Sequence, residues 1–171
     1  MAGWADVAIG GGVESMTYVP MGGFLPRPHP EYTREHAGLY VSMGITAENV
    51  ARRYKISRED QDAFAIQSYE RSAAAWKNGM YADEVVPVEV PQRRGEPLVV
   101  SQDEEYRNVK MEKVPQLRPA FSRDGTVTAA NASTINDGAA ALVLMSADKA
   151  AAMGLETLAR IRSYADAAQE P

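Results

Sequence analysis

The clearest pattern of apolar and polar positions predicts two consecutive amphipathic helices in the second quarter of the chain. The first is expected over 46–54, with Thr46 as its N-cap. Its apolar positions repeat at i, i+3, i+4 and i+7 and are Ala47, Val50, Ala51 and Tyr54. The second helix opens at Ser57, with Asp60 completing an acidic variant of the capping box, and closes at Asn78-Gly79. Its apolar stripe comprises Ala63, Phe64, Ile66, Tyr69, Ala73 and Trp76.

Short apolar runs elsewhere predict strands. Ala5 to Ile9 is the first, and Gly10-Gly11-Gly12 is expected to turn the chain tightly after it. An edge strand is expected around Pro87, a turn over 93–97 and a short return strand after it. The other expected strands cover 127–130, 139–145 and 158–165, and Ser146 is expected to cap a helix that runs through Met153.

Two segments are rich in residues that interrupt regular structure. Residues 17–39 contain repeated prolines and glycines, which excludes regular structure over more than a few residues. Residues 102–126 are charged and turn-rich, with Pro115 and Pro119 breaking any helix. Met1-Ala2-Gly3 looks like the end of a helix, so we expect the chain to start within a fold.

Composition narrows the possible partners. The formal net charge is -5, which argues against nucleic acid or an anionic membrane surface. No apolar run approaches the roughly 20 residues that span a bilayer, and we expect an intracellular, cytoplasmic protein. The 171 residues contain no cysteine, which excludes disulfides and thiolate nucleophiles on this polypeptide. Two histidines, His29 and His36, are too few for most metal or triad schemes.

Several small motifs admit a binding role and a purely structural one. The glycines at 10–12 favour a tight turn over a phosphate cradle, because they lack the spacing and the lysine of a P-loop. The polar residues over 131–138 suit either a ligand's amides or an Asx-rich turn that satisfies its own backbone. Met43 can line an apolar tunnel or belong to a core. Arg107 and Arg118 can hold phosphates or be solvated.

Four segments resemble the thiolase family in matching order and spacing. They are GGVESM at 11–16, MGITAENVARRYKISREDQDAFA at 43–65, LRPAF at 117–121 and GTVTAANASTINDGAAA at 125–141. The resemblance covers essentially the whole chain, which corresponds to less than half of a usual family chain. It implies an α/β fold, with part of a layered αβαβα core and an inserted, mainly helical loop domain. Residues 1–16 would belong to the N-terminal core domain, 17–130 would form the coenzyme A-binding loop domain, and 131–171 would return to the core.

The resemblance also implies which residues contact coenzyme A. Ser133 is expected to bond the pantetheine amides, and Ala129 to line the same channel. Phe121 and Ala120 are expected to pack near the adenine and the pantetheine. Coenzyme A would be a substrate rather than a tightly bound cofactor.

Two further positions are carried over from the family. Met43 is expected to border the acyl end of the substrate, and Arg107 to stack near the adenine. Position 42 is serine, where short-chain biosynthetic members often carry a histidine before the Met-Gly pair. This favours a degradative 3-ketoacyl-CoA type.

The catalytic groups of the family have no counterpart here. In thiolases a nucleophilic cysteine opens the helix just before the strand that reads WADVAI in this sequence, and a histidine and a second cysteine come from the C-terminal half. None of these motifs occurs in this chain. We therefore assign no catalytic residue and no metal ligand, and expect no turnover by this chain alone.

The resemblance implies a parent enzyme of fatty acid degradation by β-oxidation. That enzyme would transfer an acyl group between 3-ketoacyl-CoA and coenzyme A, releasing acetyl-CoA, and would form a homodimer or homotetramer. The alternative is a catalytically inactive coenzyme A-binding or interaction remnant, which the missing cysteine favours. A third hypothesis, a lipid-carrier thiolase-like protein, fits the MGITAENVA region less well.

Overall fold

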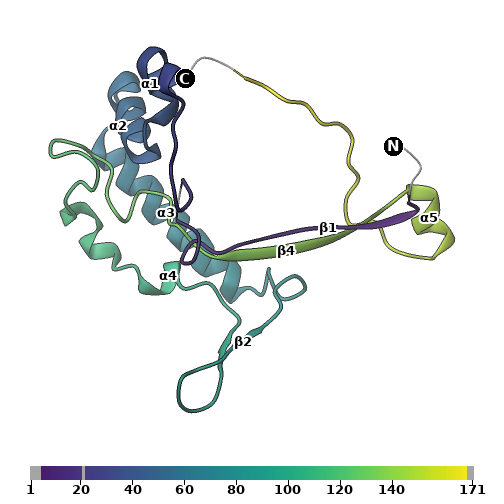
Figure 1. The fold of residues 1–171 in the computed structure, drawn as a ribbon. Helices are drawn as coiled ribbons and strands as arrows, with labels where there is room; N and C mark the ends of the chain where they lie inside the picture. Colours follow the sequence, from purple (N-terminus) through teal and green to yellow (C-terminus); the bar gives the residue numbers. More distant parts are fainter. Residues whose placement is uncertain (1–4, 21, 169–171) are drawn as a thin grey trace. The chain divides into compact units, whose positions relative to one another are not determined.

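The computed structural model describes residues 5–20 and 22–168, which form parts of two compact units. The first unit contains the chain up to Tyr40 and from Ile135 onward, and the second is Val41–Thr134. The predicted helix end at Met1-Ala2-Gly3 lies outside the described residues, as does Trp4. The described chain contains both helices and strands, which agrees with the expected α/β class (Figure 1).

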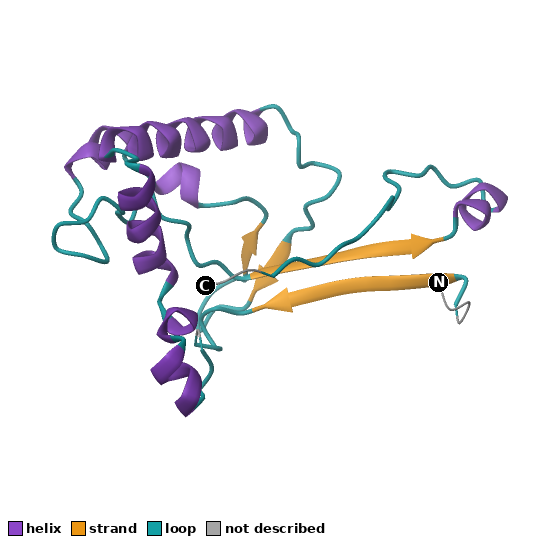
Figure 2. Cartoon of the chain, turned by 90° about the horizontal axis from the view of Figure 1, so that it is seen from above, coloured by secondary structure: helices purple, strands orange, loops and turns teal. Residues whose placement is uncertain are grey.

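The first unit is built on a long antiparallel ribbon of two strands, β1 (Val7–Glu14) and β4 (Gly138–Met145), seen in Figure 2. Pairing runs from Val7 opposite Met145 to Glu14 opposite Gly138. The strand predicted over 139–145 is confirmed. The predicted tight turn at residues 10–12 is wrong, because all three glycines lie inside β1 and pair with β4.

Close approach of the two backbones explains Gly11 of β1. A Cβ added at Gly11 would lie 2.9 Å from the carbonyl oxygen of Ala140 on β4. Ala141 and Ala140 stand opposite Gly11 and Gly12, so small residues face small residues at these two positions of the ladder. The glycines therefore serve strand pairing rather than a turn or a phosphate cradle.

The described part of the first unit also contains the short helices α1 (Pro30–Glu35), the 3₁₀ helix η1 (Ala37–Tyr40) and α5 (Ala147–Ala152). The expectation of a loop throughout 17–39 missed α1, which starts at Pro30 because proline fits the first turn of a helix. The α5 cap is confirmed, since Ser146 accepts the N–H of Lys149 at 3.2 Å.

The strand predicted over 158–165 does not form, because no strand in the described part of the chain pairs with it. Leu158 and Tyr164 are each 95% exposed. The alternation of apolar and polar residues in this segment suggests a strand, but among the described residues the segment has no neighbouring strand with which to form backbone hydrogen bonds.

The second unit contains the predicted helical hairpin, α2 (Met43–Tyr54) and α3 (Arg58–Lys77). The helix α2 begins three residues earlier than expected, with Ser42 as the N-cap in place of Thr46. The Ser57 cap and the end at Asn78-Gly79 are confirmed, and Gly79 adopts φ +69°. None of the helices in the described residues is both long and apolar enough to cross a membrane.

The remaining elements of the second unit are β2 (Val88–Val90), β3 (Leu98–Val100), α4 (Glu105–Asn108) and the 3₁₀ helix η2 (Met111–Gln116). The predicted hairpin is confirmed, with β2 and β3 antiparallel. The expectation of no helix over 102–126 is wrong. The helices α4 and η2 are short enough to form there, and η2 contains Pro115.

The strand predicted over 127–130 is also wrong, because only Thr128 makes a β-bridge, to Pro119. The buried faces of the two long helices differ from the predicted stripes as well. The helix α2 buries Glu48, and α3 buries Asp62, whereas Phe64 of α3 is 73% exposed. These inward carboxylates explain the missing strand, since they hold the chain around residue 128 in another conformation.

Replacing Ser57 with alanine tests the start of α3. The Ser57 hydroxyl accepts the N–H of Asp60 at 3.0 Å and donates to its carboxylate at 2.8 Å. We expect Ser57→Ala to lower the free energy of unfolding by about 1 kcal/mol, measured by urea titration with far-UV circular dichroism. Ser101→Ala, at an exposed loop position, is the control and should change it by less than about 0.5 kcal/mol. Equal losses in both variants would contradict this role.

Candidate functional site

The loop from Thr126 to Ser133, called here the 126–133 loop, is folded by its own side chains. The Thr128 N–H donates to Oδ1 of Asn131 at 2.7 Å, and Oγ1 of Thr128 accepts the N–H groups of Ala130 and Asn131, both at 3.3 Å. Thr128 is fully buried. The loop is therefore a compact turn with an internal polar centre.

Asn131 satisfies the backbone of its own loop, as the Asx-turn interpretation expected. Its Nδ2 donates to the carbonyl oxygen of Thr126 at 3.1 Å, in addition to the bond that it accepts from Thr128. In the first unit, Asp137 accepts the N–H of Met16 at 2.7 Å. Asn131 therefore stabilises its own loop, whereas Asp137 joins two segments that are distant in the sequence.

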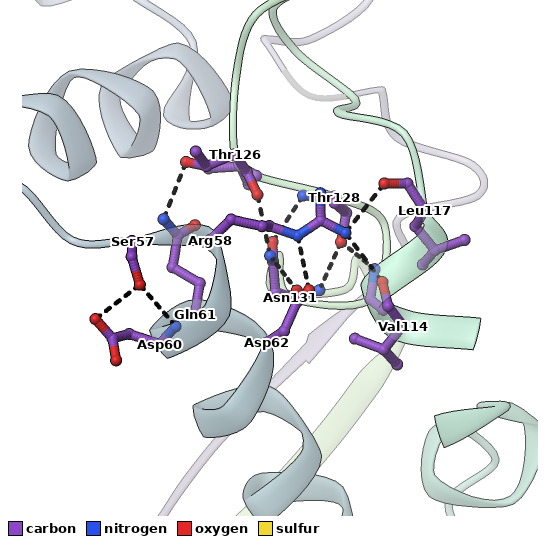
Figure 3. A network of polar contacts seen from close by, with 12 residues as sticks. Ser57, Arg58, Asp60, Gln61, Asp62, Val114, Leu117, Thr126, Thr128 and Asn131 are labelled. Carbon is purple, nitrogen blue, oxygen red and sulfur yellow. Dashed lines mark hydrogen bonds and ion pairs between the residues drawn. The ribbon is translucent and has the colours of Figure 1, made fainter. Parts of the chain in front are cut away.

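Asp62 joins the loop to α3 and to a second segment of the chain (Figure 3). Its Oδ1 accepts from Nδ2 of Asn131 at 2.9 Å, and its Oδ2 accepts from Nε of Arg58 at 2.7 Å. The same guanidinium donates through Nη2 to the carbonyl oxygens of Val114 at 2.9 Å and Leu117 at 3.0 Å. One carboxylate and one guanidinium therefore fix two chain segments on the same helix.

The beginning of the loop is held from both helices. Glu48 of α2 accepts the Thr126 N–H, and Nε2 of Gln61 on α3 donates to Oγ1 of Thr126 at 2.9 Å. Among the described residues, no buried side-chain nitrogen or oxygen lacks a hydrogen-bond partner. The polar centre of this unit is thus fully satisfied, which is the condition under which buried polar groups give a unique structure.

The LRPAF segment lies beside the loop. The Ala120 N–H donates to the carbonyl oxygen of Val127 at 2.9 Å, next to the bridge between Pro119 and Thr128. The ring of Phe121 packs so closely on the first turn of α2 that a Cβ at Gly44 would overlap it. The segment is therefore held between α2 and the loop.

Five of the six residues predicted to contact coenzyme A lie along this arrangement, and all five are exposed. Met43 precedes the glycine beneath Phe121, Ala120 is bonded to the loop, and Ala129 lies within it. Ser133 follows Ala132, whose N–H donates to the carbonyl oxygen of Thr128 at 3.0 Å. The structure thus brings three separated segments together and leaves their predicted contact residues open to solvent.

The sixth residue, Arg107, lies on α4, which packs against α3. It is exposed, and its guanidinium forms no hydrogen bond or ion pair with any described residue. Arg118 is exposed as well. In the described part of the chain no hydrogen bond or ion pair joins Arg107 to the other five residues, so its role stays a prediction.

Sequence reasoning missed the buried carboxylates that position the site. Glu48 and Asp62 are 5% and 4% exposed, and each precedes a buried alanine of its helix by three residues, Ala51 and Ala65. The sequence signal that could have revealed them is a carboxylate three residues before a small residue on the inner face of the helix. A stripe defined by apolar residues alone cannot detect it.

Tyr69 adds a third contact between α3 and the loop. Its hydroxyl donates to the carbonyl oxygen of Ala130 at 3.1 Å. Burial raises the pKa of the Tyr69 hydroxyl above its ordinary value, and the negative charge of Glu105 adds to the shift. The neutral, donating form is therefore the one that the fold favours.

A metal site and a surface hollow are the two other kinds of site to consider on the described residues. Among the described residues, no group of three or more His, Asp and Glu side chains is placed to hold a metal ion. A hollow of about 210 Å³ on α3 includes none of the predicted coenzyme A residues. Its lining residues are Phe64, Gln67, Ser68, Arg71, Ser72 and Tyr81.

Replacing Asp62 with asparagine tests the junction between the two segments. The amide presents a donor where Oδ2 accepted from Arg58, so the guanidinium loses its counter-charge. Breaking a buried ion pair lowers the free energy of unfolding by about 3–5 kcal/mol. Because the Arg58 side chain is 20% exposed, we expect a loss at the lower end of that range. Urea unfolding measures it, with the exposed Asp83→Asn as control. A loss no larger than that of the control would contradict the assignment.

The raised pKa of Tyr69 predicts a loss of stability in alkali. The group contributes stability below its unfolded pKa of about 10, and this is lost as the pH rises through the higher folded value. The urea midpoint of the unmodified chain should therefore fall more between about pH 9 and pH 11 than that of Tyr69→Phe. Tyr54→Phe, at an exposed position, should behave like the unmodified chain. Identical pH profiles for all three proteins would contradict the prediction.

Comparison with protein families identifies the chain. Residues 1–148 match the family model for the N-terminal domain of thiolase. The mitochondrial acetyl-CoA acetyltransferase of Danio rerio is 50% identical over 184 residues, covering 100% of this chain and 43% of the relative. The acetyl-CoA acetyltransferase of Chromobacterium violaceum is 48% identical over 186 residues, covering 100% of this chain and 47% of that protein. The chain thus spans less than half the length of these relatives.

Solved structures agree. The dimeric peroxisomal thiolase of Saccharomyces cerevisiae has a TM-score of 0.76 and 39% identity, covering 90% of this chain and 39% of that chain. A thiolase of Ascaris suum in complex with coenzyme A has a TM-score of 0.70 and 40% identity, covering 90% of this chain and 42% of that chain. The α/β thiolase-like fold and the resemblance seen in the sequence are confirmed. The chain belongs to the thiolase family.

Proposed function

We propose that this chain is the part of a thiolase that binds coenzyme A. The observation that carries the proposal is the arrangement around the 126–133 loop. Three segments distant in sequence are tied together by buried polar contacts, while Ala129, Ser133 and Phe121 face solvent on their outer side. A site of this kind is pre-organised, so the chain loses little conformational freedom when a ligand binds.

The exposed groups suit the pantetheine part of the ligand. Pantetheine carries amides separated by short apolar stretches, so it needs hydrogen-bonding groups and apolar surface side by side. The Ser133 hydroxyl supplies a donor and an acceptor, and Phe121 and Met43 supply apolar surface. Ala120 and Ala129 leave room beside them. Arg107 is proposed to lie by the adenine, where a planar guanidinium can stack.

The domain assignment follows the same proposal. Residues 17–130 are proposed as the coenzyme A-binding loop domain, with 1–16 and 131–171 in the N-terminal core domain. The relatives named as acetyl-CoA acetyltransferases, and the Ascaris suum thiolase in complex with coenzyme A, support it. The yeast relative is described as dimeric, which supports a homo-oligomeric parent.

The whole protein is proposed to transfer an acyl group between 3-ketoacyl-CoA and coenzyme A, releasing acetyl-CoA. A cysteine thiolate would attack the 3-keto carbonyl, and coenzyme A would then remove the acyl group from the thioester. The 171 residues contain no cysteine, so this thioester cannot form on them. Coenzyme A is proposed as a substrate and not as a tightly bound cofactor.

The direction of the reaction is proposed to be degradative, in fatty acid β-oxidation and in the cytoplasm. Ser42 supports the degradative type, since it replaces the histidine of many biosynthetic members. In this chain Ser42 has a structural duty, because its side chain accepts the N–H of Ile45 at the start of α2.

A second candidate is a catalytically inactive remnant that binds coenzyme A or another protein. The absence of cysteine from the 171 residues is the observation that favours it. The DNA on either side of the reading frame separates the two. An in-frame upstream cysteine helix with downstream Gly-His-Pro and Cys-Gly-Gly motifs would support the enzyme, and a reading frame bounded at Met1 and Pro171 would support the remnant.

Isothermal titration of the chain with coenzyme A tests the proposed function. We expect saturable binding, and Ser133→Ala should weaken it by roughly two- to tenfold, the effect of one hydrogen bond. Ser101→Ala, at an exposed position distant in sequence from the loop, should leave the affinity unchanged. Absence of binding, or equal affinities of all three proteins, would overturn the proposal.

A further inference from the structure

Glu48 makes a concentrated set of contacts with the start of the 126–133 loop. Its Oε1 accepts the N–H groups of Thr126 at 3.0 Å and Val127 at 2.9 Å. Its Oε2 accepts the Thr126 N–H at 2.9 Å and lies 3.4 Å from the Thr126 hydroxyl. Within the described residues, the hydrogen bonds of this buried carboxylate all go to the loop.

These contacts replace a strand partner. Buried backbone N–H groups must be satisfied, and the strand expected over 127–130 would have satisfied them in a ladder. The carboxylate accepts two consecutive N–H groups instead, without an ion pair to any described residue. Burying a carboxylate is costly unless it is hydrogen-bonded, so Glu48 and the loop backbone depend on one another.

The surrounding residues are shaped for this contact. A Cβ at Gly125 would overlap the Glu48 carboxylate, so only glycine fits where the chain crosses α2. One turn earlier on the same helix, Gly44 leaves room for the ring of Phe121. This face of α2 thus supports both the loop and the LRPAF segment.

We infer that Glu48 is a positioning residue for the pantetheine part of coenzyme A, an inference that rests on the proposed function. Its carboxylate fixes the backbone at Thr126 and Val127. The position of these two residues in turn sets where Ala129 and Ser133 of the same loop lie. Glu48 itself is buried, so its proposed effect on the ligand passes through the loop. It acts by holding the loop in the form that receives the pantetheine amides.

The test compares two ligands on the unmodified chain and on Glu48→Gln. Isothermal titration is done with coenzyme A and with 3′-phosphoadenosine 5′-diphosphate, which lacks pantetheine. We expect Glu48→Gln to weaken coenzyme A binding on the order of tenfold and to leave the affinity for the nucleotide within about twofold. Glu70→Gln, an exposed position on α3, is the matched control and should change neither affinity.

Amide hydrogen exchange provides a second measurement that does not need a ligand. Exchange at Thr126 and Val127 should be faster in Glu48→Gln than in Glu70→Gln, with the middle of α3 unchanged. Where Glu48→Gln does not fold, Gly125→Ala takes its place, since its Cβ disturbs the same contact from the loop.

The outcomes separate the inference from the proposed function. Equal weakening of both ligands, or unchanged exchange at Thr126 and Val127, overturns the role of Glu48. The role of Glu48 is likewise overturned if the unmodified chain and Glu48→Gln bind coenzyme A with the same affinity. No binding of coenzyme A by the unmodified chain overturns the proposed function, and the exchange rates then decide whether Glu48 holds the loop.

Discussion

Two buried carboxylates organise the second unit of this chain. Glu48 on α2 accepts backbone N–H groups at the start of the 126–133 loop, and Asp62 on α3 accepts from Asn131 and Arg58. The buried apolar residues of this unit are small, with valine the largest. Directional polar contacts, rather than a large apolar core, therefore determine how the chain crosses the helical hairpin. Because each buried side-chain nitrogen and oxygen of the described residues has a hydrogen-bond partner, the arrangement is well defined.

This construction suits a binding surface for a long, flexible ligand. The polar contacts that hold the loop are buried or partly buried, whereas the residues proposed to contact coenzyme A are exposed. A rigid support reduces the ordering cost of binding and leaves the outer face free for the ligand. The cysteine thiolate proposed to attack that ligand is not among these 171 residues, which contain no cysteine. Binding and catalysis are thus proposed to reside in different parts of the parent protein.

The sequence predicted the elements whose signals are local. The cap at Ser57, the end at Asn78-Gly79 and the antiparallel β2–β3 hairpin all depend on neighbouring residues, and all are confirmed. Prediction failed where contacts distant in sequence decide the structure. The glycines of β1 pair with β4, a strand distant in the sequence, and the loop near Thr128 follows acceptors on two helices instead of a strand. The family motifs identified the proposed contact residues, but the carboxylates beneath them needed the structure.

Backbone NMR of the chain titrated with pantetheine tests the central claim most directly. The account predicts shifts concentrated at Ala129 to Ser133, at Ala120 and Phe121, and at Met43 and Gly44. These positions come from three segments that the buried contacts bring together. Shifts confined to the hollow between Phe64 and Tyr81, or no saturable shifts at all, would contradict it.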